Sequence, residues 1–339
     1  MKGLWWKSLT VLLLLYVLVM GLRTPLGPAL VHASVDRIKV GEANFTATGY
    51  NTRFTRQKPL VWLENEGQRT CADQVEVLSD TRLQLRFTVP EGFRGKLTSL
   101  WAQDPQDGTV VLRDAFFTEG SGTGITGGDC PVATMEHAGF AFPNRTILYE
   151  TIRNLFFHVP MWFAMMALMT IAFAYSLTVL RRGSMAADQA ALAAVHVSLL
   201  FAALGLLTGS VWARATWGDW WTSDPKLNGA AVTVLIYAAY LVLRGSVADP
   251  HKRARLAAIY NIFAYVLMLV FIMVLPRLTD SLHPGNGGNP AFSQYDLDSS
   301  LRAVFYPAVL GWIGLGLWAW QLRLRLARLQ TRADEAFDA

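Results

Sequence analysis

Charged side chains are scarce in this sequence. Asp, Glu, Lys and Arg make up 16% of its 339 residues, whereas 53% of the residues are hydrophobic. Soluble globular domains carry about 25% charged residues. The shortage of charge therefore excludes an ordinary soluble protein of this length and points to the membrane.

Cysteine is almost absent, which disfavours thiol redox chemistry. Only Cys71 and Cys130 are present, and they form no CxxC motif. Both fall in a segment with the composition of a water-soluble domain, where an oxidising compartment would favour their pairing. The sequence allows either a structural disulfide or two free thiols.

Long apolar runs take the place of charge. A helix needs about 20 largely apolar residues to cross a bilayer. The fourth run is short, so we expect its ends to extend into the flanking loops or the bilayer to thin around it. The six predicted spans are Trp5–Leu22, Val159–Leu180, Ala190–Trp212, Ala230–Leu243, Leu256–Leu275 and Ala303–Leu322.

Basic residues gather at one set of span ends. They fall on one side if both termini are cytoplasmic, as the positive-inside rule requires. The net charge of +5 then reflects topology and does not indicate nucleic-acid binding. The cytoplasmic group comprises Lys2, Lys7, Arg181, Arg182, Arg244, Lys252, Arg253, Arg255, Arg323, Arg325, Arg328 and Arg332.

The first apolar segment has a second interpretation. Residues 1–20 have a basic start and an apolar core, and Val31-His32-Ala33 has the form of a signal-peptide cleavage site. Two prolines between core and site favour a retained helix. Either outcome leaves the remaining topology unchanged.

Residues 35–142 have a different composition, with short runs typical of strands and turn residues between them. In RLQLRFTV, Leu83, Leu85 and Phe87 share one face. The predicted fold is a polytopic α-helical membrane protein of six transmembrane helices with an extracytoplasmic β-sandwich inserted in the first outer loop. Residues 122–127 have GxGxxG spacing, but Gly-Asp-Cys-Pro follows them, so a loop is predicted there and not a dinucleotide site.

The sequence RATWGDWWTSDPKLNG, residues 214–229, concentrates aromatic surface between the third and fourth spans. An aromatic belt at the membrane interface explains one or two tryptophans, but belt residues are scattered over helix ends. A dense aromatic loop suits a large planar ligand, since each ring contact adds about 0.5–1.5 kcal/mol beyond area burial. The candidate residues here are Trp212, Trp217, Gly218, Trp220, Trp221, Asp224 and Lys226.

Two of the six histidines are predicted on the same outer side as this loop. His158 opens the second span in FFHVPMW, and His283 lies in DSLHPGNGG between the fifth and sixth spans. One histidine at a helix end is usually an interfacial side chain, but two that bracket an aromatic loop have the chemistry of haem axial ligands. His196, inside the third span, is the competitor. Lacking a second intramembrane histidine, it is interpreted as a helix-packing residue, with a second haem as the alternative. Surface roles are expected for His32, His137 and His251.

Three motifs resemble one family. TWGDWWTSDPKLNG resembles the tryptophan-rich WWD motif of the haem-handling proteins of cytochrome c biogenesis, the CcmC and CcsA family. FFHVPMW and SLHPG are similar to their two outer histidine segments. With six spans the chain is most similar to cytochrome c maturation protein C. The resemblance covers residues 150–325 well and 1–30 loosely. It predicts a first helix and linker (1–30), the β insertion (35–142), a five-helix haem-handling domain (150–325) and a cytoplasmic tail (326–339).

The resemblance implies a set of site residues. His158 and His283 match the axial ligands of haem b, while Trp217, Gly218, Trp221, Asp224 and Lys226 match the WWD motif. Ser223 stands where the family usually has a further tryptophan, and the β insertion replaces a loop that is usually short. Trp212 and Trp220 supply additional rings. Candidate partners for the haem propionates are Lys226, Arg214, Arg277 and Arg302.

The function implied is transfer of haem b at the periplasmic face of a bacterial inner membrane. The expected partners are membrane lipids, a periplasmic haem chaperone, a small membrane subunit and ABC-type components of cytochrome c maturation. Whether this haem-lyase-like step is catalysis or presentation stays open. The alternatives are a membrane b-type cytochrome, a haem transport permease subunit, or a functional β domain anchored by the spans.

Overall fold

The computed structural model describes residues 3–120, 130, 135, 137, 139–145, 148–283 and 297–337. The chain divides into two compact units. One comprises Met1–Arg23 with Glu150–Ala339, and the other comprises Thr24–Tyr149. Each unit has a hydrophobic core of its own.

The first unit contains six helices that are long and apolar enough to cross a membrane, which confirms the six predicted spans. Each span continues beyond its predicted run at one end or at both, because backbone hydrogen bonding continues through the polar residues that flank an apolar run. The residues expected to form a tail belong largely to the last helix. The helices are α1 (Trp5–Arg23), α2 (His158–Arg182), α3 (Met185–Trp217), α4 (Pro225–Ser246), α5 (Pro250–Leu269), α6 (Leu275–Leu278) and α7 (Ser299–Phe337). Helices α5 and α6, with the turn between them, form one of the six spans.

Local sequence signals set several of these ends. The Asp224 carboxylate caps α4 by accepting from Lys226 N, and Pro225 occupies the first turn. At its other end, α3 stops at Trp217 because Gly218 adopts a left-handed conformation with φ of 87°. A π-helical turn, Val270–Val274, joins α5 to α6, and a 3-10 helix, Tyr149–Phe156, precedes α2.

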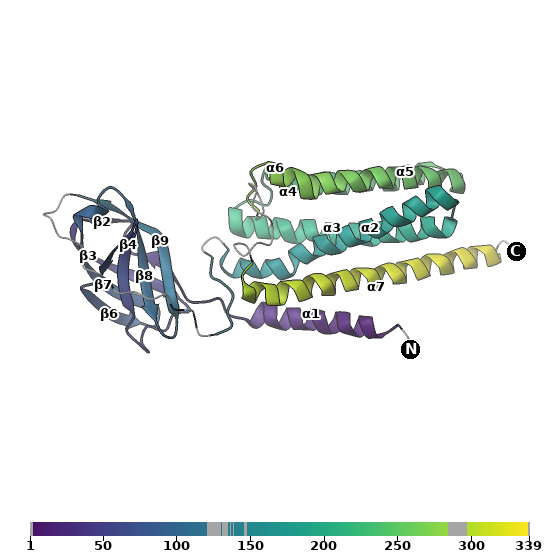
Figure 1. The fold of residues 1–339 in the computed structure, drawn as a ribbon. Coiled ribbons are helices and arrows are strands. Elements are labelled where there is room, and N and C mark those ends of the chain that lie inside the picture. Colours follow the sequence, from purple (N-terminus) through teal and green to yellow (C-terminus); the bar gives the residue numbers. More distant parts are fainter. Residues whose placement is uncertain are drawn as a thin grey trace. The chain divides into compact units, whose positions relative to one another are not determined.

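Helices α2 and α3 pack along each other at the centre of this unit, and α5 and α7 both contact α2. Helix α1 lies against α7, at the opposite end of the sequence (Figure 1). Two glycines of α7 make this approach possible. A Cβ at Gly314 would lie 2.4 Å from Thr10 Oγ1, and one at Gly311 would lie 3.0 Å from Leu14 Cδ2. Close helix approach through small residues is typical of membrane packing.

The second unit contains nine strands among its described residues. They form a four-stranded sheet in the order β1-β3-β7-β6 and a five-stranded sheet in the order β2-β9-β8-β4-β5. Buried side chains of both sheets form one core. The strands are β1 (Ala29–Ala33), β2 (Arg37–Lys39), β3 (Gly41–Tyr50), β4 (Leu60–Asn65), β5 (Gln68–Cys71), β6 (Gln74–Ser79), β7 (Arg82–Val89), β8 (Leu97–Asp104) and β9 (Gly108–Glu119).

The strand predictions are confirmed in most of this unit. The alternation in β7 buries Leu83, Leu85 and Phe87. Residues 37–51 contain two strands of different sheets, β2 and β3, because Gly41, with φ of 98°, changes the direction of the chain where β3 starts. Strands β1 and β5 are too short for their sequences to show the two-residue alternation that is typical of strands. The proposed cleavage tripeptide, residues 31–33, lies within β1.

Cys71 and Cys130 form a disulfide with a Cα–Cα distance of 5.5 Å. It closes a loop with a sequence separation of 59 residues. The GxGxxG segment, residues 122–127, lies outside the described residues.

Candidate functional site

His158 is the first residue of α2, and its ring is held by α3. Its Nδ1 lies 3.0 Å from the hydroxyl oxygen of Thr208. That hydroxyl donates its own proton to the carbonyl of Leu204 at 2.8 Å, so it accepts from the histidine. The arrangement assigns the imidazole proton to Nδ1 and leaves the lone pair on Nε2.

The face of α3 that meets His158 is built for close contact. Gly205, Thr208, Gly209 and Trp212 recur at helical spacing and share one side of the helix. A Cβ at Gly209 would lie 2.8 Å from His158 Cε1, and one at Gly205 would lie 2.8 Å from the Trp162 ring. The glycines therefore provide the space that two large rings of α2 occupy.

His283 follows α6 and is held by the capping residue of α4. Its Nδ1 lies 3.0 Å from Asp224 Oδ1. The second carboxylate oxygen of Asp224 accepts from Ser281 Oγ at 2.8 Å and from Leu282 N at 2.7 Å. One buried side chain thus starts a helix, fixes a loop and orients a histidine.

The Asp224 carboxylate is ionised in this setting. Burial alone would raise its pKa, but the hydrogen bond and charge of His283, with hydrogen bonds from Ser281 and Leu282, outweigh burial and hold the pKa well below its ordinary value. Because an ionised carboxylate only accepts hydrogen bonds, the proton between Asp224 and His283 belongs to His283 Nδ1. In the neutral form of this imidazole, the lone pair is then on Nε2.

Two tryptophans bring the histidines into one cluster. The Trp212 ring lies 6.5 Å from that of His158 and 5.7 Å from that of His283, measured between centroids. Trp217 lies 5.0 Å from both Trp212 and His283. Residues from α2, α3 and the segment after α6 therefore meet around one indole.

The remaining members of the tryptophan loop lie differently. Trp220 and Trp221 have exposed fractions of 60% and 43%, and Trp221 Nε1 donates to Asn228 at 3.1 Å. Gly218 accepts from the guanidinium of Arg214 through its carbonyl. Lys226 lies in the first turn of α4, where its backbone N–H donates to Asp224. The loop is therefore split into an inner pair that contacts the histidines and an outer, exposed pair.

Two residues of this site, Thr208 and Ser281, were missed by sequence reasoning. Asp224 was named as a motif position, and Asp-Pro before an apolar run is also a recognisable helix start. The spacing of Gly205, Thr208, Gly209 and Trp212 was a readable signal for Thr208. Nothing in the sequence indicated the contact of Ser281 with Asp224.

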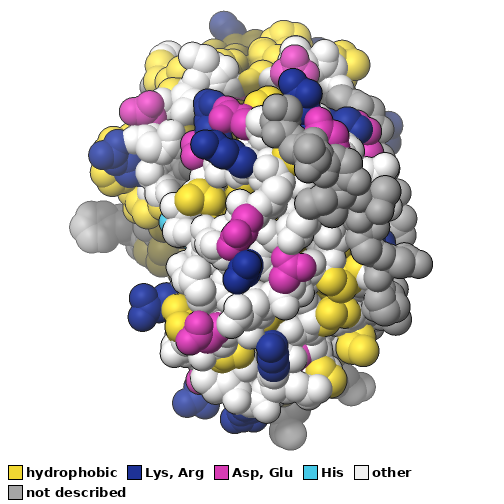
Figure 2. Space-filling model, turned by 90° about the vertical axis from the view of Figure 1, so that its left-hand side faces the viewer, with side chains coloured by type: hydrophobic (Ala, Val, Ile, Leu, Met, Phe, Trp, Pro, Cys, Tyr) yellow, Lys and Arg dark blue, Asp and Glu magenta, His cyan; other side chains and the backbone are white. Residues whose placement is uncertain are grey.

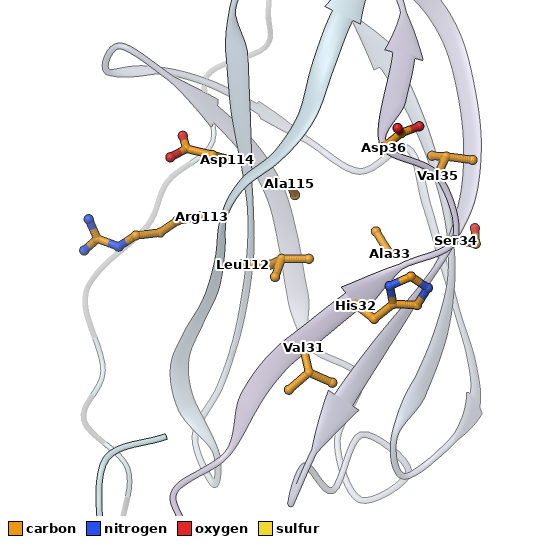
Figure 3. Close-up of a pocket in the computed structure, with 10 residues that line it drawn as sticks. All are labelled: Val31, His32, Ala33, Ser34, Val35, Asp36, Leu112, Arg113, Asp114 and Ala115. Carbon is orange, nitrogen blue, oxygen red and sulfur yellow. The ribbon is translucent and has the colours of Figure 1, made fainter. Parts of the chain in front are cut away.

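The other described histidines lie outside the cluster. Within α3, His196 Nδ1 is 3.4 Å from an Arg323 guanidinium nitrogen of α7. His137 Nδ1 lies 3.0 Å from the carbonyl of Gln106, and His251 is exposed at the start of α5. His32 lines a pocket of about 440 Å³ between β1 and β9, with Arg113 and Asp114 at its rim (Figure 3). None of these side chains shares a tryptophan with His158 or His283 among the described ring contacts.

Comparison with known proteins decides the family. The family described as heme exporter protein C matches residues 130–336 of this chain, which include α2 to α6 and all but the last residue of α7. The chain belongs to the CcmC family. With its six long apolar helices, this makes it a multi-pass membrane protein. Most of the β unit precedes the matched region.

Individual relatives show how far the similarity extends. The heme exporter protein C of Paracoccus denitrificans is 27% identical over 197 residues, which are 58% of this chain and 78% of that protein. The heme exporter protein C of Bradyrhizobium diazoefficiens is 35% identical over 113 residues, 33% of this chain and 43% of that protein. A cytochrome c biogenesis protein CcsA of Prochlorococcus marinus, strain MIT 9303, is 37% identical over 81 residues, 24% of this chain and 26% of that protein. The chain thus spans less than half of the second protein and about a quarter of the third.

Proposed function

We propose that this protein binds haem b at the outer membrane face through His158 and His283 and presents it to a periplasmic haem chaperone during cytochrome c biogenesis. One observation carries the proposal. Two imidazoles more than 100 residues apart in the sequence contact the same indole, Trp212. The names of the relatives, heme exporter protein C and cytochrome c biogenesis protein CcsA, agree with haem as the ligand.

The donor set fits haem iron. Each histidine engages its Nδ1 with a protein group, and neutral imidazoles with Nε2 free are standard axial ligands. Trp212 and Trp217 supply apolar ring surface beside these nitrogens, where a planar macrocycle gains stacking contacts. Haem b would supply the iron and a macrocycle with a vinyl-bearing edge, while the protein holds and orients it.

The outer, exposed pair of tryptophans supports presentation over enclosure. Trp220 and Trp221 leave ring surface accessible beside a site whose histidines are buried or half-buried. A partner protein reaches a ligand held at such a rim without the helices separating. We place this rim on the periplasmic side of a bacterial inner membrane with cytoplasmic termini, because Lys and Arg cluster at the opposite ends of the helices.

The propionates need cationic or donor groups near the rim. Lys226 and Arg214 lie in the tryptophan loop segment, and Arg277 is in α6. In the first turns of α7, Arg302 Nε is buried without a hydrogen-bond partner among the described residues. Arg302 is thus the candidate whose donor is still available for a carboxylate.

The β unit is proposed to be a β-sandwich in the first outer loop that docks the chaperone or another maturation component. Only its position in the chain motivates this assignment. On the face shown in Figure 2, basic and acidic side chains alternate, so that face presents no single-sign patch among its described residues. Replacing residues 25–148 by a flexible linker should reduce cytochrome c assembly while leaving haem binding intact. Undiminished assembly would contradict the docking role.

The main test is an absorption spectrum of detergent-purified protein in both oxidation states. Wild type should show a six-coordinate, low-spin b-type haem. H158A and H283A should each lose one axial ligand, and the double variant should lose loading by 10-fold or more. H251A is the matched control, because His251 is an exposed histidine on α5. Full haem occupancy in the double variant would falsify the assignment.

Two alternative functions make distinct predictions. A b-type cytochrome that moves electrons across the membrane would need haem at a second depth, for which His196 is the available ligand, and H196A would then remove part of the haem. A permease would need polar or broken helices near mid-membrane. Loss of haem in H196A but not in H158A would favour the cytochrome.

A further inference from the structure

The two histidines of the cluster differ in the group that holds them. His283 Nδ1 donates to a carboxylate, Asp224, at 3.0 Å, whereas His158 Nδ1 donates to a neutral hydroxyl, Thr208, at the same distance. Hydrogen bonds to charged acceptors are roughly twice as strong as those between neutral groups. The two hydrogen bonds therefore have the same length but different strengths.

The surroundings of Asp224 increase the difference. Its side chain is 0% exposed, and four further donors hold the carboxylate in place: Lys226 N, Leu227 N, Ser281 Oγ and Leu282 N. A hydrogen bond in such a water-poor setting is stronger than the same bond in solvent. Thr208 remains a neutral acceptor, whose orientation is fixed by its own hydrogen bond to Leu204.

A carboxylate on Nδ1 pulls the ring proton towards itself and increases the electron density at Nε2. This raises the basicity of the imidazole as a metal ligand, as in carboxylate–histidine–metal arrangements. A hydroxyl acceptor also raises the basicity of the imidazole, but by a smaller amount. His283 and His158 should therefore bind the same iron with different strengths.

We propose that Asp224 is a positioning residue that makes His283 the anchoring ligand, and that His158, held by Thr208, is the exchangeable ligand when haem is passed on. This inference rests on the proposed function. It assigns the handover to the α2 side of the site. Asp224 touches neither iron nor macrocycle in this assignment and acts through His283.

The first experiment leaves Asp224 and Thr208 unchanged. H158A and H283A are purified with haem, reduced, and the iron–histidine stretching frequency is measured by resonance Raman spectroscopy. H158A, in which His283 is the sole axial ligand, should show the higher frequency and the slower haem loss to apomyoglobin. Equal frequencies, the reverse order, or haem retained by H283A but not by H158A would overturn the proposal.

The second experiment tests whether Asp224 causes the difference in iron binding between His283 and His158. D224N in the H158A background should lower the stretching frequency and weaken haem retention by about 10–100-fold. T208V in the H283A background should weaken it by about 5-fold, the equivalent of one neutral hydrogen bond. Asn is about as good a helix cap as Asp, so α4 should still start at the same residue.

D249N is the control for a purely structural effect. Asp249 caps α5 as Asp224 caps α4, by accepting from Lys252 N with a proline in the first turn, and it makes none of the described contacts with His283. Its stretching frequency should match that of its parent, and a shift as large as that of D224N would overturn the role of Asp224. If wild-type protein shows no bis-histidine haem, the proposed function itself fails. If it shows such haem and D224N leaves the frequency unchanged, only the present inference fails.

Discussion

At the scale of single residues, the proton on Nδ1 is what links structure to proposed chemistry. Both histidines could carry their proton on either nitrogen in water. Thr208 and Asp224 remove that choice, because each presents an acceptor to Nδ1. The lone pairs that remain are on the nitrogens farthest from the backbone.

Gly209→Ala tests how much the site depends on the position of His158. The new methyl group would lie 2.8 Å from His158 Cε1, so the ring must move. Haem occupancy, measured by the pyridine haemochrome assay, should fall about 10-fold, the range for disturbed ligand orientation. Alanine favours helix over glycine by about 1 kcal/mol, so α3 itself should not weaken.

Gly245→Ala provides the comparison. Gly245 is also in a helix, and a Cβ there meets nothing within 4 Å. Its haem occupancy should equal that of wild type. Equal occupancy in the two variants would mean that the His158 ring is not held against α3.

Residue chemistry was only partly accessible from the sequence. His158, His283 and the tryptophans were recognisable because their residue types are rare and chemically distinctive. The division of the tryptophans into inner and outer pairs was not, because it depends on Gly218 ending α3 between Trp217 and Trp220. Sequence spacing does not determine in which direction a chain turns after such a residue.

At the scale of elements, α3 is the helix on which the site is built. Its C-terminal end carries Thr208, Gly209 and Trp212, and its N-terminal end carries Asp188 in the first turn. Asp188 forms a bidentate ion pair with Arg244 of α4, at 2.6 and 2.7 Å. The same helix is thus fixed to α2 at one end and to α4 at the other.

Removing one partner of this pair should destabilise the helical unit strongly. The two side chains are only 8% and 10% exposed, so D188A leaves a buried guanidinium without its carboxylate, at a cost of about 3–5 kcal/mol. We expect a markedly lower melting temperature in detergent, measured by tryptophan fluorescence. The double variant D188L/R244L should recover most of the loss, since it buries no charge.

A solvent-exposed ion pair provides the control for this prediction. Glu66 and Lys96 of the β unit form an ion pair at 2.6 Å, with side chains 72% and 41% exposed. E66A should change stability by about 1 kcal/mol or less. A D188A effect of the same size would contradict the assignment of Asp188–Arg244 as a buried structural pair.

Helix existence was predictable, and helix ends were less so. Hydropathy locates the apolar middle of a span, but α3 and α7 continue well beyond that middle. Asp224 and Asp249, each followed by proline, marked the starts of α4 and α5 in the sequence. The π turn between α5 and α6 has no comparable signal, although a Cβ at Gly229 would lie 2.4 Å from the Phe271 carbonyl oxygen of that turn.

At the scale of the whole molecule, the chain combines two folding units with separate cores. The family match covers residues 130–336, so it includes the helical unit from Glu150 onward, while α1 and most of the β unit precede it. Composition alone indicated the division, because residues 35–142 contain short runs separated by turn residues and no long apolar run. The pairing of sheets was beyond the sequence, since β2 joins β9 from a distant part of the chain.

The disulfide provides a test of this independence. Closing a loop with a sequence separation of 59 residues stabilises a domain by roughly 4 kcal/mol in the chain-entropy description. C71S/C130S should make the β unit much more sensitive to limited proteolysis. The haem spectrum of the helical unit should not change.

Reduction of wild-type protein with dithiothreitol should reproduce the proteolysis result, whereas C71S/C130S should be indifferent to the reductant. A haem spectrum that changes with reduction of the disulfide would show that the two units are energetically coupled.

The pairing of α1 with α7 has a consequence for biosynthesis. Ribosomes extend a chain at about 5–20 residues per second, so α1 waits tens of seconds in the bilayer before its partner is made. Helix α1 must therefore be stable in lipid without α7 during that interval. Its 19-residue sequence is apolar, and its only charged residues are Lys7 and the terminal Arg23. A nascent chain interrupted before α7 would leave Thr10 facing acyl chains where it should face Gly314.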